Sequence, residues 1–247
     1  MKSKFVTLLV CFLFIACSDE EALTFEPISI SSDPCENCTT VLIEIPHALG
    51  KNKLSETINT ALQNEIIALL NFDEESNAYN LKSATNAFIT DYEELNDKFP
   101  EESIPWEAKI EGSITFENKD LITIQLESYI FTGGAHGYGT NRYLNFDKAN
   151  GVELFHEDLF KSKEDFKNFT ETLFRKQENI PADVNINSTG FMFETEDFYL
   201  PDNIGYTDDG LLLFYEPYEI ASFADGPITI TIPYKDANVF LRFSAKS

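Results

Sequence analysis

The chain has 247 residues, and its 18 Lys and Arg against 42 Asp and Glu give a formal net charge of −24. This excess of negative charge repels a phosphate backbone, so nucleic acid is excluded as the expected partner. Hydrophobic residues make up 43% of the chain and charged residues 24%, which excludes a disordered acidic tail and predicts one large or two small folded domains. A chain of this charge is expected to attract cationic partners.

The first segment has the pattern of a secretory signal peptide. Lys2 and Lys4 precede an apolar run over residues 5–16, which is too short for a membrane-spanning helix. The run ends at Cys17, and the residues before it resemble a bacterial lipobox. We therefore expect residues 1–16 to be removed and Cys17 to be lipidated. The alternative is an ordinary signal peptide in which Cys17 has no special role.

An acidic run, Ser18-Asp19-Glu20-Glu21, follows the expected anchor. It resembles a surface-export signal of double-membraned bacteria, and the alternative is the solvated start of a linker. Because no periodicity follows, residues 17–34 are expected to form a lipidated, flexible tether. The expected product is an outer-membrane lipoprotein exposed at the cell surface, with a periplasm-facing position as the alternative. Only the lipid is expected to contact the membrane.

Two cysteines, Cys35 and Cys38, remain as thiols once the signal and the anchor are set aside. Their C-x-x-C spacing is also found in redox and zinc sites. A redox pair normally begins a helix, whereas this pair leads into the β-branched stretch 39–43. A zinc site would need further ligands, and no second cysteine pair exists. We expect a structural disulfide at the start of the first strand.

Hydrophobic periodicity predicts the order of the elements. Alternation with period two indicates strands, and spacing of three to four residues indicates helices. We expect a strand over 41–46, helices over 54–71 and 83–99, a hairpin over 106–130, a Gly-rich loop over 132–139, a hairpin over 143–154, a helix capped by Ser162, a polar loop over 179–190, and strands over 198–206, 211–215 and 228–232. Ser83 is the expected cap of the second helix.

This order predicts an α+β fold of antiparallel sheets with packed helices, arranged as two sequential subdomains that join near the Gly-rich loop. The predicted boundaries are 35–140 and 141–247. The acidic residues concentrated over 194–209 are interpreted as a solvated face, or alternatively as a docking face for a cationic protein.

Several ordered motifs resemble known extracytoplasmic domains. In the first half these are Ile45-Pro46, Trp106, Tyr129-Ile130-Phe131 and Thr132-Gly133-Gly134-Ala135-His136-Gly137, which resemble the N-terminal domain of PdaC-type proteins. In the second half they are Phe146-Asp147, Gly151, Leu159-Phe160, Asp209-Gly210-Leu211, Phe214-Tyr215, Pro217-Tyr218-Glu219-Ile220-Ala221, Gly226 and Ile232-Pro233-Tyr234, which resemble the domain of RsiV-type lysozyme-sensing anti-sigma factors.

The resemblance implies an extracytoplasmic binding domain rather than an enzyme. The metal-dependent catalytic domain of the deacetylase has no counterpart among the motifs of this sequence, and neither does the sigma-binding region of the anti-sigma factor. We therefore expect no catalytic residue, no metal site and no cofactor. The three histidines, His47, His136 and His156, form no metal-binding motif.

The candidate binding residues are Gly133, Gly134, His136 and Tyr138 in the Gly-rich loop, together with Tyr218. The loop has two interpretations: a corner of the fold into which His136 is hydrogen-bonded, or a binding loop that presents His136 and Tyr138. Tyr218 is interpreted as a partly buried ring whose hydroxyl finds a partner, or alternatively as a ring that stacks on a ligand.

Two functions follow as expectations. The RsiV-type resemblance implies a surface-anchored, non-enzymatic module that binds or sequesters lysozyme or another cationic protein. The alternative is a cell-wall glycan-binding protein, or an accessory to peptidoglycan modification, that uses aromatic residues such as Trp106 or Tyr138. The sequence makes no prediction of oligomeric state.

Overall fold

A computed structural model describes residues 23–33, 35, 37–71, 78–100 and 103–245. The first part of the chain forms a six-stranded sheet in which each strand pairs with its neighbour in sequence. The strands are β1 (Phe25–Ser31), β2 (Thr40–Ala48), β3 (Glu107–Glu117), β4 (Leu121–Phe131), β5 (Tyr138–Asp147) and β6 (Val152–Leu154). All neighbours are antiparallel except β2 and β3, which are parallel because two helices connect them.

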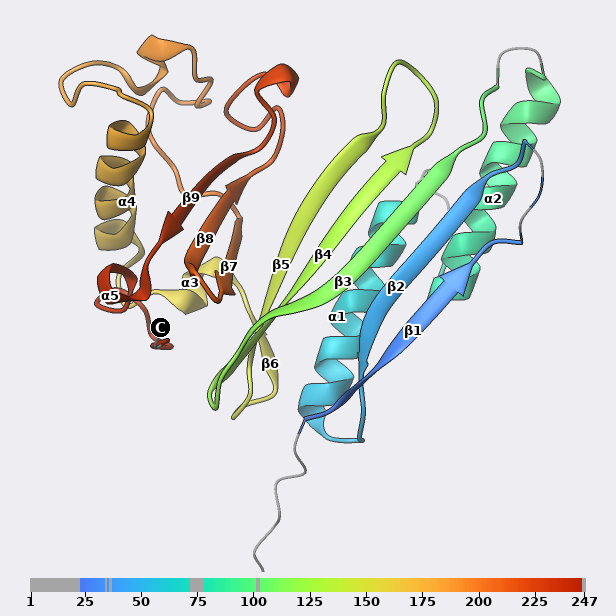
Figure 1. Ribbon diagram of the computed structural model, residues 1–247, viewed down its shortest axis with the longest axis horizontal. Coiled ribbons are helices and arrows are strands. Elements are labelled where there is room, and N and C mark those ends of the chain that lie inside the picture. Colours follow the sequence, from blue (N-terminus) through green and yellow to red (C-terminus); the bar gives the residue numbers. More distant parts are fainter. Residues whose placement is uncertain (1–22, 34, 36, 72–77, 101–102, 246–247) are drawn as a thin grey trace, which may run out of the picture.

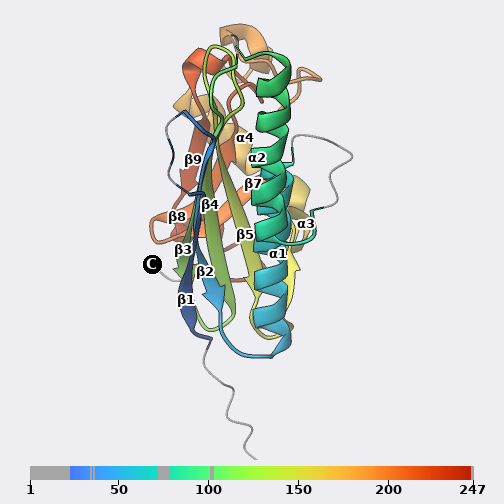
Figure 2. The ribbon, with the colours of Figure 1, turned by 90° about the vertical axis from the view of Figure 1, so that its right-hand side faces the viewer.

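These helices, α1 (Lys53–Leu70) and α2 (Leu81–Lys98), lie on the same face of the sheet, as Figure 2 shows, and contact each other. The side chain of Asn52 caps α1 by accepting from the backbone N–H of Ser55 at 2.9 Å. The sequence predicted Ser83 as the N-cap of α2, and this prediction is wrong. The N-cap is Asn80, which lies about one turn earlier. Ser83 instead occupies the third helical position and completes a reciprocal capping box with Asn80.

The first core lies between the helices and the sheet. Alternate residues of the central strands point to this face, and apolar residues of α1 and α2 meet them. The buried residues include Val41, Ile43, Ile45, Ile58, Leu62, Ile66, Phe88, Trp106, Ile110, Ile122, Ile124, Leu126, Leu144 and Phe146. The strand and helix periodicity predicted from sequence thus reflects one continuous hydrophobic layer.

The second part of the chain forms a smaller α+β unit (Figure 1). Its three-stranded antiparallel sheet has the order β7 (Asn203–Thr207), β8 (Gly210–Tyr215) and β9 (Ile228–Ile232). The other elements are α3 (His156–Leu159), α4 (Lys163–Gln177), the short 3-10 helices η1 (Ile186–Thr189) and η2 (Phe223–Asp225), and α5 (Tyr234–Ala237). Ser162 caps α4 as predicted, with its hydroxyl accepting from the backbone N–H of Asp165 at 3.2 Å.

The second core is rich in aromatic rings. Phe174 of α4 is fully buried, and its ring centroid lies 4.9–6.2 Å from those of Phe191, Phe193, Phe198 and Tyr215. Such aromatic pairs add to the free energy gained from burial alone.

The two sheets dock through β7, which packs against β5, β4 and β3. Asn203 Oδ1 accepts from the backbone N–H of Tyr143 at 2.9 Å, and Asn145 Nδ2 donates to the carbonyl of Ile204 at 2.8 Å. The ring of Tyr143 lies so close to Gly205 that any Cβ at that position would overlap it. The two domains therefore share an interface of specific hydrogen bonds and close backbone approach.

The predicted fold class, α+β with two sequential domains, is confirmed, and three predicted segments need correction. The tether prediction for 17–34 is wrong from Phe25 onward, because Phe25, Ile28 and Ile30 of β1 pack against the first core. Pro27 is accommodated because β1 is an edge strand.

The predicted boundary at residue 140 falls inside β5, and the first sheet continues to Leu154. The strand predicted over 198–206 begins only at Asn203. Residues 1–22, with Cys17 and the acidic run, lie outside the described residues. In the part of the chain that is described, no helix is long and apolar enough to cross a membrane.

Candidate functional site

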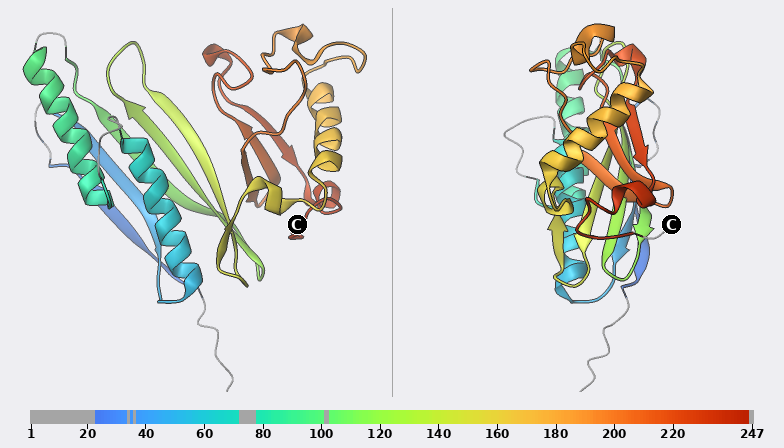
Figure 3. Two further views of the ribbon diagram at one scale, coloured as in Figure 1. Left: turned by 180° about the vertical axis from the view of Figure 1, so that it is seen from behind. Right: turned by 90° about the vertical axis from the view of Figure 1, so that its left-hand side faces the viewer.

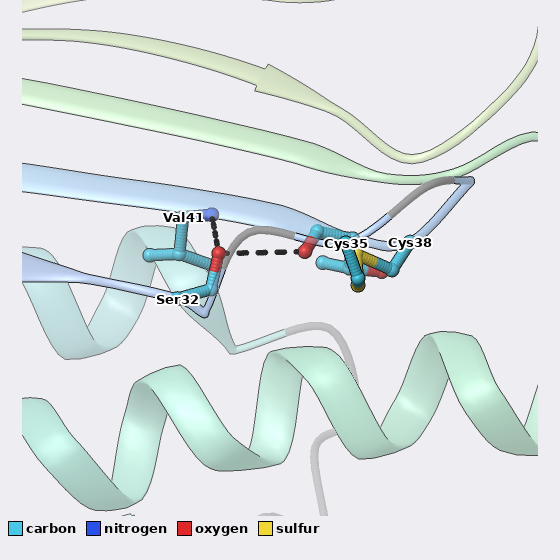
Figure 4. The surroundings of a disulfide bond; sticks show 5 residues. Ser32, Cys35, Cys38 and Val41 are labelled. Atoms are coloured by element: carbon cyan, nitrogen blue, oxygen red, sulfur yellow. Dashed lines mark hydrogen bonds between the residues drawn. A yellow bond between two sulfur atoms is a disulfide. The ribbon is translucent and has the colours of Figure 1, made fainter.

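A disulfide joins Cys35 and Cys38 in the connection between β1 and β2 (Figure 4), with their Cα atoms 5.8 Å apart. Beside it, Ser32 Oγ accepts from the backbone N–H of Val41 at 3.0 Å and donates to the carbonyl of Thr39 at 3.5 Å. The pair lies next to a strand rather than at the start of a helix, so its surroundings are those of a structural link.

Four rings from both domains meet at one end of the molecule, where the β4–β5 loop lies near η2 (Figure 1). His136 stacks on Phe223 with ring centroids 4.1 Å apart, and Tyr218 stacks on Phe223 at 5.3 Å. Tyr138 donates its hydroxyl proton to the carbonyl of Pro217 at 3.2 Å. We call His136, Tyr138, Tyr218 and Phe223 the aromatic patch.

The patch is open to solvent. Tyr218 is 60% exposed and Tyr138 is 38% exposed, while His136 is exposed and Phe223 is half-buried. Among the described residues, the Tyr218 hydroxyl has no hydrogen-bond partner. The interpretation of Tyr218 as a partly buried ring with a bonded hydroxyl is therefore wrong, and its ring is available for a ligand.

Local backbone geometry fixes these rings. Tyr218 has a φ of 71°, which is a left-handed conformation that bulky residues rarely adopt. Gly137 lies under the ring of Tyr129, where any Cβ would overlap the ring. Such unusual geometry at an exposed aromatic residue is a feature of functional surfaces.

Two carboxylates lie behind the patch at the interface between the domains. Glu216 Oε1 accepts from the backbone N–H of Asn141 at 3.2 Å and from Asn203 Nδ2 at 3.5 Å. Its other oxygen is buried without a hydrogen-bond partner among the described residues. Burial raises the pKa of Glu216 to about 7 despite the hydrogen bond from Asn141 and the nearby charge of Arg142. Burial also raises the pKa of Glu219, whose carboxylate accepts from the backbone N–H of Glu216 at 2.8 Å.

The remaining candidates, Gly133 and Gly134, do not join the aromatic patch. They line a separate hollow of about 200 Å³ together with Leu95, Phe99, Ser103, Ile104, Trp106 and Thr132. Trp106 is only 1% exposed, so the prediction that it stacks on a glycan is wrong. Its ring instead packs against Phe88, with centroids 5.2 Å apart, in the first core.

Sequence reasoning missed Phe223 and Glu216. Phe223 lies in the connection between β8 and β9, and the spacing of Ser222 and Asp225, which form a capping contact, was the one local signal of an ordered turn. Glu216 was one carboxylate among many in an acidic chain. Within the described ranges, no group of three or more His, Cys, Asp or Glu residues is arranged to hold a metal ion.

Comparisons with known proteins define the two domains. A family described as "Deacetylase PdaC" matches residues 35–138, and one described as "Protein of unknown function (DUF3298)" matches residues 153–235. Residues 35–138 thus match a PdaC domain, as the sequence motifs predicted, and residues 153–235 match a DUF3298 domain. The narrower resemblance to RsiV-type anti-sigma factors stays a prediction.

One curated relative is the peptidoglycan-N-acetylmuramic acid deacetylase PdaC of Bacillus subtilis (strain 168), which is 24% identical over 130 residues. The match covers 51% of this chain and 27% of that protein. The chain therefore spans only about a quarter of the length of this relative.

Two solved structures share the fold. A member of the DUF3298 family from Bacteroides fragilis NCTC 9343 superimposes with a TM-score of 0.72 at 21% identity, over 90% of this chain and 95% of that one. A DUF3298 family protein from Pseudomonas aeruginosa PAO1 gives a TM-score of 0.64 at 17% identity, over 91% and 98% of the two chains. The arrangement of both domains is thus common to these proteins.

Proposed function

We propose that this protein is a non-enzymatic binding module that captures a cationic protein, such as lysozyme, through the aromatic patch. The observation that carries the proposal is the stack of His136, Phe223 and Tyr218, which is exposed and is built by both domains together. Exposed aromatic clusters of this kind supply the central contacts of protein interfaces.

The charge of the chain supports a cationic partner. With a net charge of −24, long-range attraction raises the rate at which a basic protein arrives at the surface. The nearby carboxylates of Glu216 and Glu219 also raise the pKa of Tyr138, after the larger effect of its own burial. The field around the patch is therefore negative.

A lipid anchor would hold the binding module at the cell surface, where it would meet a cationic protein from outside the cell. We propose that Cys17 carries the lipid and that the mature chain is held on the outer membrane, facing the cell exterior. The lipobox-like residues before Cys17 and the acidic run 18–21 support this location.

The test is calorimetry of the mature chain against lysozyme at low and at high salt. Saturable binding is expected at low salt, with an affinity that falls as salt rises, because surface charges are screened beyond about 8 Å at physiological ionic strength. Tyr218→Ala and Phe223→Ala should each weaken binding by at least about 30-fold if these rings are central contacts.

The matched control is Tyr79→Ala, because Tyr79 is 77% exposed and lies away from the patch at the start of α2. It should bind lysozyme as tightly as the unchanged chain. No heat with lysozyme at low salt, or equal losses in all three variants, would contradict the proposal.

The second candidate function is binding of a cell-wall glycan, or assistance to peptidoglycan modification, at the same patch. The observation that favours it is the stacked, exposed geometry of the rings, since sugar rings pack on aromatic faces. Binding of a neutral glycan should respond little to salt, and Tyr218→Ala should abolish it. Hydrolysis of any tested polymer would contradict the non-enzymatic role.

A further inference from the structure

A polar groove lies along α1, which runs beside β6 (Figure 3). It consists of two hollows of about 360 Å³ and 290 Å³ that meet at Glu153. The side chains that line the groove include Lys53, Glu56, Thr57, Thr60, Asn64, Glu65, Arg142, Glu153, Phe155, His156, Glu157 and Asp202.

The larger hollow lies between the domains. Arg142 of β5 pairs loosely with Glu65 of α1, at 3.7 Å. His156 lies between two carboxylates, with Nε2 3.0 Å from Glu157 and Nδ1 3.5 Å from Asp202. Both domains thus contribute charged groups to one hollow whose volume suits a small ligand.

Glu153 occupies the junction of the two hollows. It is half-buried, and its carboxylate has no hydrogen-bond or ion-pair partner among the described residues. Burial raises its pKa, the charge of Glu65 raises it further, and Arg142 lowers it. Because partial burial disfavours the charged form of Glu153, an ammonium group of a ligand at this point would stabilise the carboxylate.

The charges and the hydrogen-bonding groups of the groove indicate which kind of ligand would fit it. Five carboxylates line the groove against two permanent cations, Lys53 and Arg142, and Lys163 lies 3.6 Å from Glu157. The balance of charge is still negative, so a cationic ligand is favoured. The smaller hollow adds hydroxyl and amide groups from Thr57, Thr60 and Asn64, which suit a ligand rich in hydroxyl groups.

The ring of Phe155, which is 62% exposed, lies at the larger hollow and offers a face to an apolar sugar surface. A cationic peptide is less well matched, because β6 has only three residues and gives little edge for backbone pairing.

From this juxtaposition we propose that the groove binds a short oligomer of an amino sugar whose amino groups are free and protonated. The ammonium group at the junction meets Glu153, the hydroxyl groups of one sugar meet the threonine and asparagine side chains of α1, and an adjacent ring stacks on Phe155. This site is separate from the aromatic patch and does not depend on the function proposed for it.

The experiment compares two oligosaccharides of equal length by calorimetry with the mature chain. One is a glucosamine oligomer with free amino groups, and the other is the corresponding N-acetylglucosamine oligomer. We expect the free-amine oligomer to bind at least about tenfold more tightly, which is the effect of one hydrogen bond to a charged group.

Glu153→Gln and Asn64→Ala should each weaken binding of the free-amine oligomer, the former by about tenfold. Asn64 is exposed on α1, so its replacement keeps the proposal testable if Glu153→Gln alters the fold. Glu93→Gln, at an exposed position of α2, removes the same charge away from the groove and is the matched control.

Equal affinity for the two oligomers would overturn the proposal, because the charge of the ligand would then play no part. An equal loss in Glu93→Gln and Glu153→Gln would overturn it too, since binding would follow net charge alone. Tighter binding of a short lysine peptide than of the free-amine oligomer would assign the groove to a peptide instead.

Discussion

Glu216 offers the sharpest test of how the two domains are joined. Its carboxylate lies at the interface, bonded to Asn141 of β5 and to Asn203 of β7, and one of its oxygens is buried without a partner among the described residues. Glu216→Gln keeps the shape of the side chain and removes the charge. We expect this variant to be more stable than the unchanged chain at pH 8.

The magnitude follows from the pKa of Glu216, which burial raises from 4.5 to about 7. A difference of this size corresponds to about 3 kcal/mol of preference for the neutral acid. Partial solvent exposure reduces this value, so we expect about 1–2 kcal/mol. Because the pKa is raised, the contribution to stability is fully present below about pH 4.5 and is lost as pH rises to about 7.

The assay is thermal unfolding of both proteins between pH 4 and pH 8. The unchanged chain should lose stability across pH 5–7, and Glu216→Gln should lose less, so that the variant melts about 2–6 °C higher at pH 8. Glu93→Gln is the control, since it removes an exposed charge from α2. Equal or lower stability of Glu216→Gln at pH 8 would refute the interpretation of Glu216 as a buried, unfavourable charge.

Three further predictions concern the anchor, the disulfide and the second core. Cys17→Ala should abolish lipid labelling and release the protein from the membrane fraction; unchanged fractionation and labelling would contradict the anchor. Intact mass before and after reduction should differ by two hydrogen atoms for the bond between Cys35 and Cys38, and two free thiols in oxidised protein would rule it out. Phe174→Ala should lower the free energy of unfolding by about 3–5 kcal/mol in denaturant titrations, because a buried ring with four aromatic neighbours is lost. A loss below about 1 kcal/mol would mean that the aromatic core is loosely packed.

The elements with strong periodicity could be predicted from the sequence. Alternation in β2 and the helical spacing in α1 both arise from one buried layer, so each pattern is visible locally. Capping chemistry is local as well, and Ser162 was identified correctly. Ser83 was misassigned because Asn80, three residues earlier, supplies the reciprocal contact and takes the cap position.

The edge strand β1 was missed, although Ile28 and Ile30 alternate with serines and pack against the first core. Pro27 interrupts the alternation and resembles a linker residue, although an edge strand tolerates proline.

The aromatic patch was predicted in part. His136, Tyr138 and Tyr218 were candidates, but Phe223, the ring on which His136 and Tyr218 stack, comes from a distant turn without periodicity.

The central claim is that both domains together form one protein-binding surface at the aromatic patch. Hydrogen–deuterium exchange of the mature chain, alone and saturated with lysozyme, measures this most directly. The account predicts that lysozyme slows exchange in two separate segments, 132–139 and 216–226, with little change along α1. A shared surface would be contradicted if lysozyme left exchange unchanged in both segments, or slowed it in only one of the two domains.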